Sequence, residues 1–302
     1  MARGQLAGQG AVLTFHGLRE DGVPAGVRDE SLHLRVSTFR AVCRHLAERY
    51  RVMPLTEMAV LLRRGEPLPP RAVALTFDDG YASNYHLGFP ILHELGLPAT
   101  IFLVTGFVDR CTPLWFQQVD RAVEVGAQLA PSNSLEDILA RLKTLPDAHL
   151  REHLSNLPGM PLGDGPAVTR PLNWDQVREM HASGLVEFGG HTHTHPVLAR
   201  CTLEQQRLEI ETCRDRIMAE LGKAPRVFAF PNGKPGDYAP ETLDFLTASG
   251  FESAWTMIND RVTGAASIME MPRYGAPGSV LETEATVSGA FELLKQWKGR
   301  KA

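Results

Sequence analysis

Two adjacent carboxylates, Asp78 and Asp79, follow a short apolar segment and precede Gly80. The segment 72–75 is Ala-Val-Ala-Leu, which predicts a buried strand ending at the two acids. Burying two carboxylates is costly unless a partner compensates their charge. At a strand end, where Gly80 permits a sharp turn, one carboxylate can hold a metal ion while the other exchanges a proton. An Asp-Asp-Gly surface turn is the alternative for these residues alone.

Three histidines lie within five residues, at His191, His193 and His195. Imidazole is a common zinc ligand, so the cluster indicates a metal site rather than a polar loop. An extended segment would place all three side chains on one face, whereas one helical turn would pair His191 with His195 and direct His193 away. The Gly-Gly pair at 189–190 and Pro196 favour the turn. The spacing differs from HExxH, the helical motif of zinc proteases.

The composition places the chain among soluble globular proteins. Of its 302 residues 43% are hydrophobic and 22% charged, and its net charge of −4 argues against a nucleic-acid-binding face. No segment approaches the roughly 18 apolar residues of a membrane span. Without an apolar signal segment before the first strand, we expect a cytoplasmic protein. Its four cysteines form no CxxC pair, which excludes zinc-ribbon and thioredoxin motifs.

Predicted strands alternate with helices, which indicates parallel βαβ units. Each polar cluster follows a strand, and in a (β/α) barrel such points meet at the rim that carries active sites. An open doubly wound sheet is the alternative, but the sequence after the first strand, Phe15-His16-Gly17-Leu18, is not a phosphate-binding loop. The predicted strands are 11–15, 51–54, 72–75, 99–104, 185–188, 227–230, 253–255 and 267–269.

The predicted helices flank these strands, and an insertion interrupts the alternation between about residues 105 and 171. Within it, 134–145 and 147–157 are predicted helices, and 158–171 is a Pro/Gly-rich loop. Because the region is short for a domain, we interpret 1–302 as one domain with a helical insertion that covers one side of the cleft. Helices are also predicted from Ser37 or Thr38 to Tyr50, and at 56–64, 90–94, 173–183, 202–221, 241–249 and 282–297.

Three motifs together resemble those of polysaccharide deacetylases with the NodB homology domain, carbohydrate esterase family 4. They are Thr-Phe-Asp-Asp-Gly at 76–80, His191-Thr192-x-x-His195, and Phe-Ala-Phe-Pro-Asn-Gly at 228–233. Segments 13–16 and 99–103 are also similar, so the resemblance extends over about 11–275 apart from the insertion. It implies a distorted (β/α)7 barrel and one divalent metal ion, foremost Zn²⁺, with Co²⁺, Ni²⁺ or Mn²⁺ as alternatives.

The resemblance also implies a role for each motif residue. The metal ion would act as a Lewis acid on an acetyl carbonyl and lower the pKa of bound water. Asp79, His191 and His195 would be its ligands, Asp78 the general base, Thr192 a residue that orients a ligand, and the main-chain N–H of Asn232 an oxyanion donor at a position where the family usually has Tyr.

Two residues depart from the family pattern. The arginine that braces the base in many members is replaced by Ala229, and Arg273 is a candidate substitute, with a surface arginine as the alternative. The late Leu-x-x-x-His motif is missing, since no histidine follows His195. His16, at the end of the first strand, is then the candidate acid, and its imidazole can carry a proton near neutral pH. A hydrogen-bonded strand-end histidine is the alternative.

The implied reaction removes N-acetyl groups from an N-acetylated sugar in a polysaccharide or its precursor. We expect contacts to the glycan from Tyr81, Phe230, Pro231 and Trp255, although aromatic side chains of this kind also serve packing. A metal-dependent amidohydrolase acting on a small non-sugar amide is one alternative. A carbohydrate-binding protein with a decayed site is another, but such a site would have no use for a base at Asp78.

Overall fold

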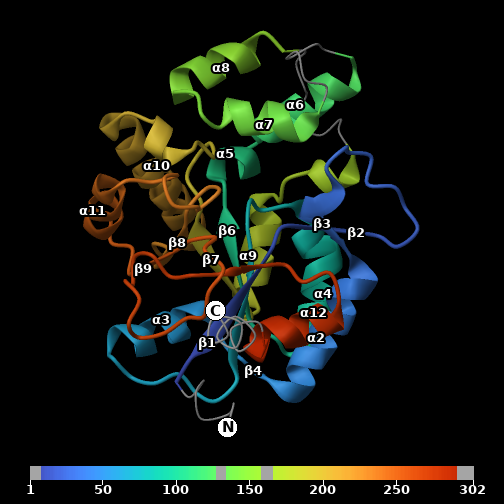
Figure 1. Ribbon diagram of the computed structural model, residues 1–302, viewed down its shortest axis with the longest axis vertical. Helices are drawn as coiled ribbons and strands as arrows, with labels where there is room; N and C mark the ends of the chain where they lie inside the picture. Colours follow the sequence, from blue (N-terminus) through green and yellow to red (C-terminus); the bar gives the residue numbers. More distant parts are fainter. Residues whose placement is uncertain (1–7, 127–133, 158–165, 291–302) are drawn as a thin grey trace, which may run out of the picture.

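The computed structural model describes residues 8–126, 134–157 and 166–290 (Figure 1). Its centre is a curled parallel sheet in the order β10-β1-β5-β6-β7-β8-β9, with β4 beside β5. An isolated bridge between Trp255 and Met271 joins β9 to the segment just before β10. The predicted distorted (β/α)7 barrel is therefore confirmed, as a parallel sheet curled into a half-barrel and surrounded by helices.

The strands of the main sheet are short and almost fully buried, as expected when helices cover a parallel sheet. They are β1 (Gly10–Phe15), β4 (Arg51–Val52), β5 (Ala72–Phe77), β6 (Ala99–Leu103), β7 (Val186–Gly190), β8 (Val227–Ala229), β9 (Ser253–Trp255) and β10 (Tyr274–Gly275). A second, two-stranded parallel sheet consists of β2 (Gly17–Arg19) and β3 (His33–Arg35).

Helices follow most strands, and two begin with the capping boxes expected from sequence, Asn173 with Gln176 and Thr202 with Gln205. None of the described helices is long and apolar enough to cross a membrane. They are α2 (Val36–Arg49), α3 (Leu55–Arg63), α4 (Phe89–Leu95), α5 (Thr105–Val108), α6 (Trp115–Glu124), α7 (Leu135–Leu142), α8 (Asp147–Ser155), α9 (Trp174–Ala182), α10 (Leu203–Leu221), α11 (Pro240–Ala248) and α12 (Val280–Val287).

Alternation along the strands divides the core into two layers. Leu13 and Leu75 pack outward against helices, whereas Val12 and Ala74 fill the barrel interior together with Trp255. By the same alternation, positions 14 and 16 of the first strand and positions 76 and 78 of its neighbour face the interior. The side chains at the carboxyl ends of β1 and β5 therefore point toward one central site.

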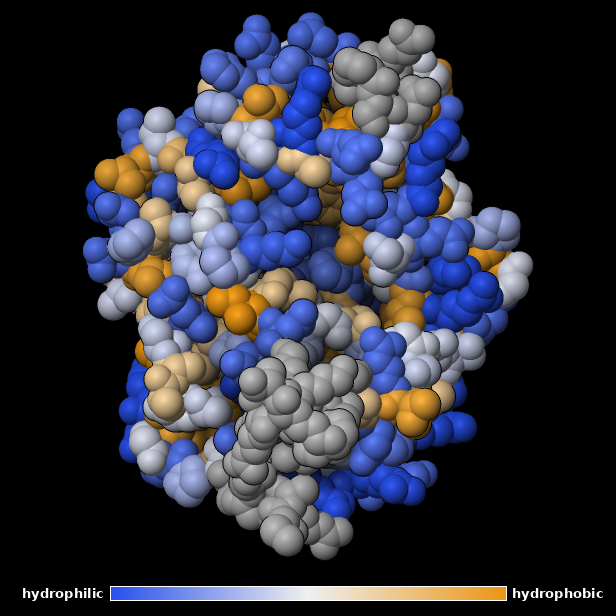
Figure 2. All heavy atoms as spheres, viewed as in Figure 1, coloured by the Kyte–Doolittle hydropathy of each residue, from blue (hydrophilic) through white to orange (hydrophobic). Residues whose placement is uncertain are grey.

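The insertion packs as a small helical layer over the carboxyl ends of the strands (Figure 1). Its helices α6, α7 and α8 share an apolar core of their own, which includes Trp115, Ile138 and Leu150. Helices α5 and α6 were not predicted from sequence, although Trp115, Val119 and Ala122 recur at the spacing of one helical face. On this view the molecular surface is hollowed between the insertion and the barrel (Figure 2).

Three predicted elements differ from the structure. The strand at 267–269 is wrong, because a turn closed by the Glu270 N–H and the Ser267 carbonyl interrupts the extended backbone, and β10 pairs with β1 instead. Helix α2 begins at Val36, and Ser37 donates to Asp21 at 2.6 Å rather than capping the helix. Helix α12 ends at Val287, before Gly289 at a φ of +75°, so it does not continue to 297; residues 291–302 lie outside the described part.

Candidate metal and catalytic site

The turn after β5 separates the two carboxylates. The Asp78 N–H still donates to the Phe15 carbonyl at 2.9 Å, so Asp78 continues the strand. Asp79 and Gly80 then adopt φ values of +75° and +88°. A Cβ atom on Gly80 would lie 2.9 Å from the Leu103 side chain, which explains the glycine at this close approach. The two neighbouring acids consequently have different surroundings and different partners.

Asp79, His191 and His195 form a buried cluster that could hold a metal ion. The Asp79 Oδ1 atom lies 3.6 Å from His191 Nε2 and 3.4 Å from His195 Nε2, and it has no hydrogen-bond partner in the described part of the chain. Two ligand atoms at about 2.1 Å from one tetrahedral ion are about 3.4 Å apart, so the spacing fits. His191 Nδ1 lies 2.7 Å from the Ala229 carbonyl oxygen. Donation there leaves the Nε2 lone pair for a metal.

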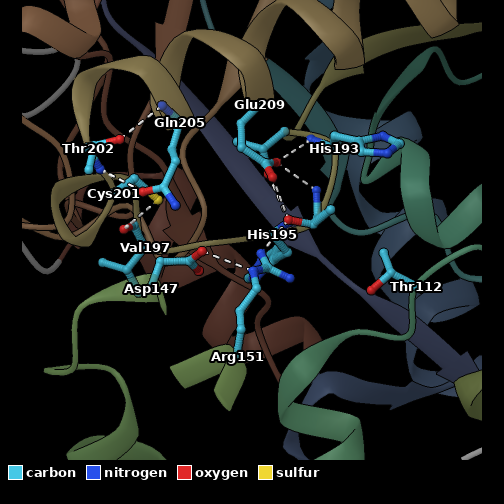
Figure 3. A network of polar contacts seen from close by, with 12 residues as sticks. Thr112, Asp147, Arg151, His193, His195, Val197, Cys201, Thr202, Gln205 and Glu209 are labelled. Carbon is cyan, nitrogen blue, oxygen red and sulfur yellow. Dashed lines mark hydrogen bonds and ion pairs between the residues drawn. The ribbon is translucent and has the colours of Figure 1, made fainter. Parts of the chain in front are cut away.

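The histidine segment forms the turn, not the extended strand. Thr192 and His195 both have positive φ, at 66° and 60°, and the His195 N–H donates to Thr192 Oγ1 at 3.0 Å. His193 lies outside the cluster, with its Nδ1 2.9 Å from Thr105 Oγ1. The Glu209 carboxylate on α10 accepts a hydrogen bond from the main-chain N–H of His193 at 2.9 Å, which fixes the turn to this helix (Figure 3).

Asp78 is paired with Arg273, which is fully buried. The guanidinium makes two parallel contacts, from Nη1 to Asp78 Oδ1 at 2.7 Å and from Nη2 to Oδ2 at 2.9 Å, and its Nε donates to the Thr256 carbonyl at 3.1 Å. The surface-arginine alternative is therefore wrong. Burial raises the pKa of Asp78, but the charge and hydrogen bonds of Arg273, together with the nearby histidines, outweigh it, and the pKa falls to about 2. The carboxylate is thus charged at neutral pH.

The pKa of Asp79 is shifted in the opposite direction to that of Asp78. Burial and the neighbouring charge of Asp78 raise the pKa of the Asp79 carboxyl, because a second negative charge is unfavourable there. Burial also lowers the pKa of His191 to about 4 and that of His195 well below its usual value. Neutral imidazoles are the protonation state that a divalent metal requires, and a cation at Asp79 would favour its charged carboxylate.

His16 lies beside Asp78 across the β1–β5 pair, where Phe15 is opposite Phe77. Its carbonyl accepts a hydrogen bond from Asn84 Nδ2 at 2.7 Å. Loss of hydration lowers the pKa of His16, against the charge of Asp78, which raises it. The expectation of a charged imidazole near neutral pH is therefore wrong, because desolvation outweighs the nearby carboxylate.

The four residues expected to contact a glycan are all buried. Trp255 fills the barrel interior and donates its Nε1–H to Ser253 Oγ at 3.0 Å. Phe230 stacks on Tyr238 with ring centroids 4.1 Å apart, and Pro231 beside it is also buried. Their aromatic and apolar surface belongs to the core, so they offer no face to a substrate. Tyr81 is fully buried too, and its hydroxyl lowers the pKa of the nearby Asp79 carboxyl, a proximity that sequence did not suggest.

Asn232 stands after β8 with a φ of +60°, and its Nδ2 is buried without a partner in the described residues. Glu209, Gln117 and Phe116 also contact the site or its loops, but nothing in the sequence singled them out. They come from helices whose residues are distant in sequence from the motifs, and only the fold brings them together.

A parallel half-barrel with a buried Asp/His/His cluster at its strand ends defines a barrel protein with a candidate metal site. The model of the polysaccharide deacetylase family matches residues 65–254, more than half of the chain. The chain therefore belongs to the polysaccharide deacetylase family.

The chain is similar in sequence to a named deacetylase and similar in fold to several solved structures. Over 270 residues it is 27% identical to the poly-beta-1,6-N-acetyl-D-glucosamine N-deacetylase of Escherichia coli K12, covering 80% of this chain and 33% of that protein. The chain thus spans about a third of that relative's length. The Streptococcus pyogenes deacetylase PplD in complex with acetate matches with a TM-score of 0.66 at 18% identity, covering 92% of this chain and 98% of that one. IcaB from Ammonifex degensii matches with a TM-score of 0.58 at 21% identity, and the match covers 93% of this chain and 97% of that one. These structures support the fold.

Proposed function

We propose that the chain is a metal-dependent hydrolase that removes N-acetyl groups from an N-acetylated sugar of a polysaccharide or its precursor. One observation carries the proposal: a charged carboxylate, Asp78, adjoins in sequence a ligand of the buried cluster of Asp79, His191 and His195. A protein that only binds sugar has no need for this pairing. Membership of the family and the name of the E. coli relative support the choice of reaction and substrate.

Zinc is the ion we propose. Two imidazole nitrogens and one carboxylate oxygen form a donor set that Zn²⁺ accepts readily, and Co²⁺, Ni²⁺ or Mn²⁺ are alternatives. With three protein ligands, the site has the pattern of a catalytic zinc rather than a closed structural one. A bound ion would act as a Lewis acid on the acetyl carbonyl and on the attacking water.

The chain's own residues supply the proton transfers. Asp78 takes a proton from the attacking water, and the two contacts with Arg273 hold its carboxylate in one orientation. The main-chain N–H of Asn232 donates to the acetyl oxygen as negative charge develops there. The protonated fraction of His16 then gives its proton to the departing amine, which is a poor leaving group without it. Transfer of the proton from Asp78 to His16 restores the starting state.

Acetate release tests the proposal. We expect the metal-loaded chain to release acetate from β-1,6-linked N-acetylglucosamine oligomers, to lose this activity after chelation and to regain it with Zn²⁺. Asp78→Asn should keep the metal and lose about 10²–10⁴-fold in kcat/KM, the usual contribution of a general base. Hydrolysis of small acetamides without hydrolysis of any oligomer would favour the amidohydrolase instead, and no release from either would refute catalysis.

A further inference from the structure

The helical insertion contacts His195, the histidine turn and a neighbour of Asp79, through side chains that no motif includes. We propose that helices α6 and α8 position the metal ligands, by Gln117 acting through Tyr81 on Asp79, by Phe116 on His195, and by Arg151 on the turn between the histidines. The insertion would then set metal affinity as well as cover the cleft. This inference rests on the metal site of the proposed function, but not on its substrate or reaction.

The first connection runs from α6 to the carboxylate ligand. Gln117 Nε2 donates to the Tyr81 hydroxyl at 3.3 Å, and this hydroxyl lies close enough to Asp79 to lower the pKa of its carboxyl. Asp79 Oδ1 has no hydrogen-bond partner among the described residues. The tyrosine hydroxyl supports the carboxylate, whose free oxygen faces His191 and His195.

Tyr81 itself has little freedom to move. Its side chain is fully buried, and its ring makes edge contacts with His33 at 5.2 Å and with Phe107 at 5.8 Å between centroids. Gln117 is only 6% exposed. A buried hydroxyl that Gln117 holds in place acts as a rigid support beside the ligand, and its removal takes a polar group away from Asp79.

The second connection runs from the insertion to the histidine turn. Phe116, beside Gln117 on α6, meets the His195 ring edge-on, with centroids 5.4 Å apart and planes at 70°. Arg151 on α8 donates from Nη2 to Thr194 Oγ1 at 2.5 Å, and Thr194 in turn donates to Glu209 Oε1 at 2.5 Å (Figure 3). The turn is thus held between the insertion on one side and the barrel helix α10 on the other.

Together these contacts link the helical insertion to the surroundings of the carboxylate ligand, Asp79, and to the imidazole ligand His195. Partners of this type keep ligands oriented before the metal arrives, and their loss typically weakens metal binding about 10–100-fold. A merely structural insertion would affect folding of the metal-free protein but not its affinity for the ion. Metal affinity, measured without substrate, therefore distinguishes the two roles.

The experiment measures the Zn²⁺ dissociation constant of the full chain by competition with a chelator of known affinity, and thermal unfolding of the metal-free protein. Tyr81→Phe keeps the ring contacts and removes only the hydroxyl, and we expect Zn²⁺ to bind about 10–100-fold more weakly. Gln117→Met and Arg151→Met should each weaken binding severalfold. The matched controls are Gln118→Met on the same helix and Arg207→Met, whose side chain pairs with Glu211 on α10; both should bind as the unaltered chain does.

Wild-type affinity in Tyr81→Phe and Arg151→Met would overturn the proposal, as would equal weakening in the controls. If Tyr81→Phe unfolds when metal-free, the visible absorption spectrum of Co²⁺ bound to Gln117→Met is measured instead. A displaced carboxylate ligand would change that spectrum. An unchanged spectrum would contradict the proposal. Failure to release acetate would refute the proposed function and leave these affinities unaffected.

Discussion

At the scale of single residues, the pairing of Arg273 with Asp78 is the contact that most defines the chemistry. Ala229 stands where many family members carry an arginine, and Arg273 reaches Asp78 from a segment more than forty residues later. Two parallel hydrogen bonds fix the plane of the carboxylate, and the positive charge keeps it ionised despite full burial. An arginine can thus hold this carboxylate from the segment before β10, because only its final position matters.

Arg273→Lys should move the acid limb of the pH profile. Lysine keeps the charge but loses the planar, two-pronged contact, so the pKa of Asp78 should rise from about 2. A base must be ionised to act, and its activity is lost as the pH falls through its pKa, so a higher pKa shifts the acid limb of kcat/KM upward. Metal content is assayed at each pH, and Arg261→Lys, at a buried arginine elsewhere, is the control. An acid limb at the same pH in Arg273→Lys would contradict this assignment.

His16 allows a second test, on the alkaline limb. Because desolvation lowers its pKa below the usual 6.5, the protonated imidazole is present only at lower pH. If His16 is the acid, kcat/KM should fall as the pH rises through that lowered pKa. His16→Ala should retain metal, lose about 10²–10⁴-fold in rate and lose this limb. His45→Gln on α2, the control, should change neither the rate nor the alkaline limb. An alkaline limb that persists in His16→Ala would remove His16 from the mechanism.

At the scale of elements, the turn after β7 decides which histidines can bind. Positive φ at Thr192 and His195 folds the segment back, so that His191 and His195 meet while His193 faces Thr105. Neither residue is glycine, so the conformation is strained and depends on outside support. The Glu209 carboxylate, which accepts the N–H of His193, provides part of that support.

Single alanine substitutions should separate the three histidines. His191→Ala and His195→Ala each remove a ligand and should lose most of the bound metal, whereas His193→Ala removes a side chain outside the cluster and should keep it. Metal content after dialysis, measured by elemental analysis, gives the answer. Loss of the metal in His193→Ala alone would mean that the segment binds in an extended conformation.

At the scale of the whole molecule, the curled parallel sheet gathers loops that are far apart in the sequence. The turns after β5 and β7 supply the cluster, β1 places His16 beside Asp78, and the segment before β10 supplies Arg273. The insertion lies over the same strand ends, and its surface adjoins the hollow on that face (Figure 2).

Local sequence determined the elements and the motif residues of this protein. Alternating apolar runs specify strands such as β1, β5 and β6, and capping boxes such as Asn173 with Gln176 mark helix starts, because these patterns depend on neighbours only a few residues away. Strand-end placement of Asp79, His191 and His195 was also visible, since parallel strands end at one rim. The family resemblance rested on these same residues.

Only the tertiary structure determined which other side chains contact or support the motif residues. Arg273 was a candidate in the sequence, but its burial against Asp78 follows from the closure of the sheet through β10. Trp255 and Phe230 were expected at the substrate and instead fill the core, because an aromatic residue gives no local sign of which side of the sheet it will face. The link from Gln117 to Asp79 spans separate elements, and long-range packing of this kind leaves no periodic pattern in the chain.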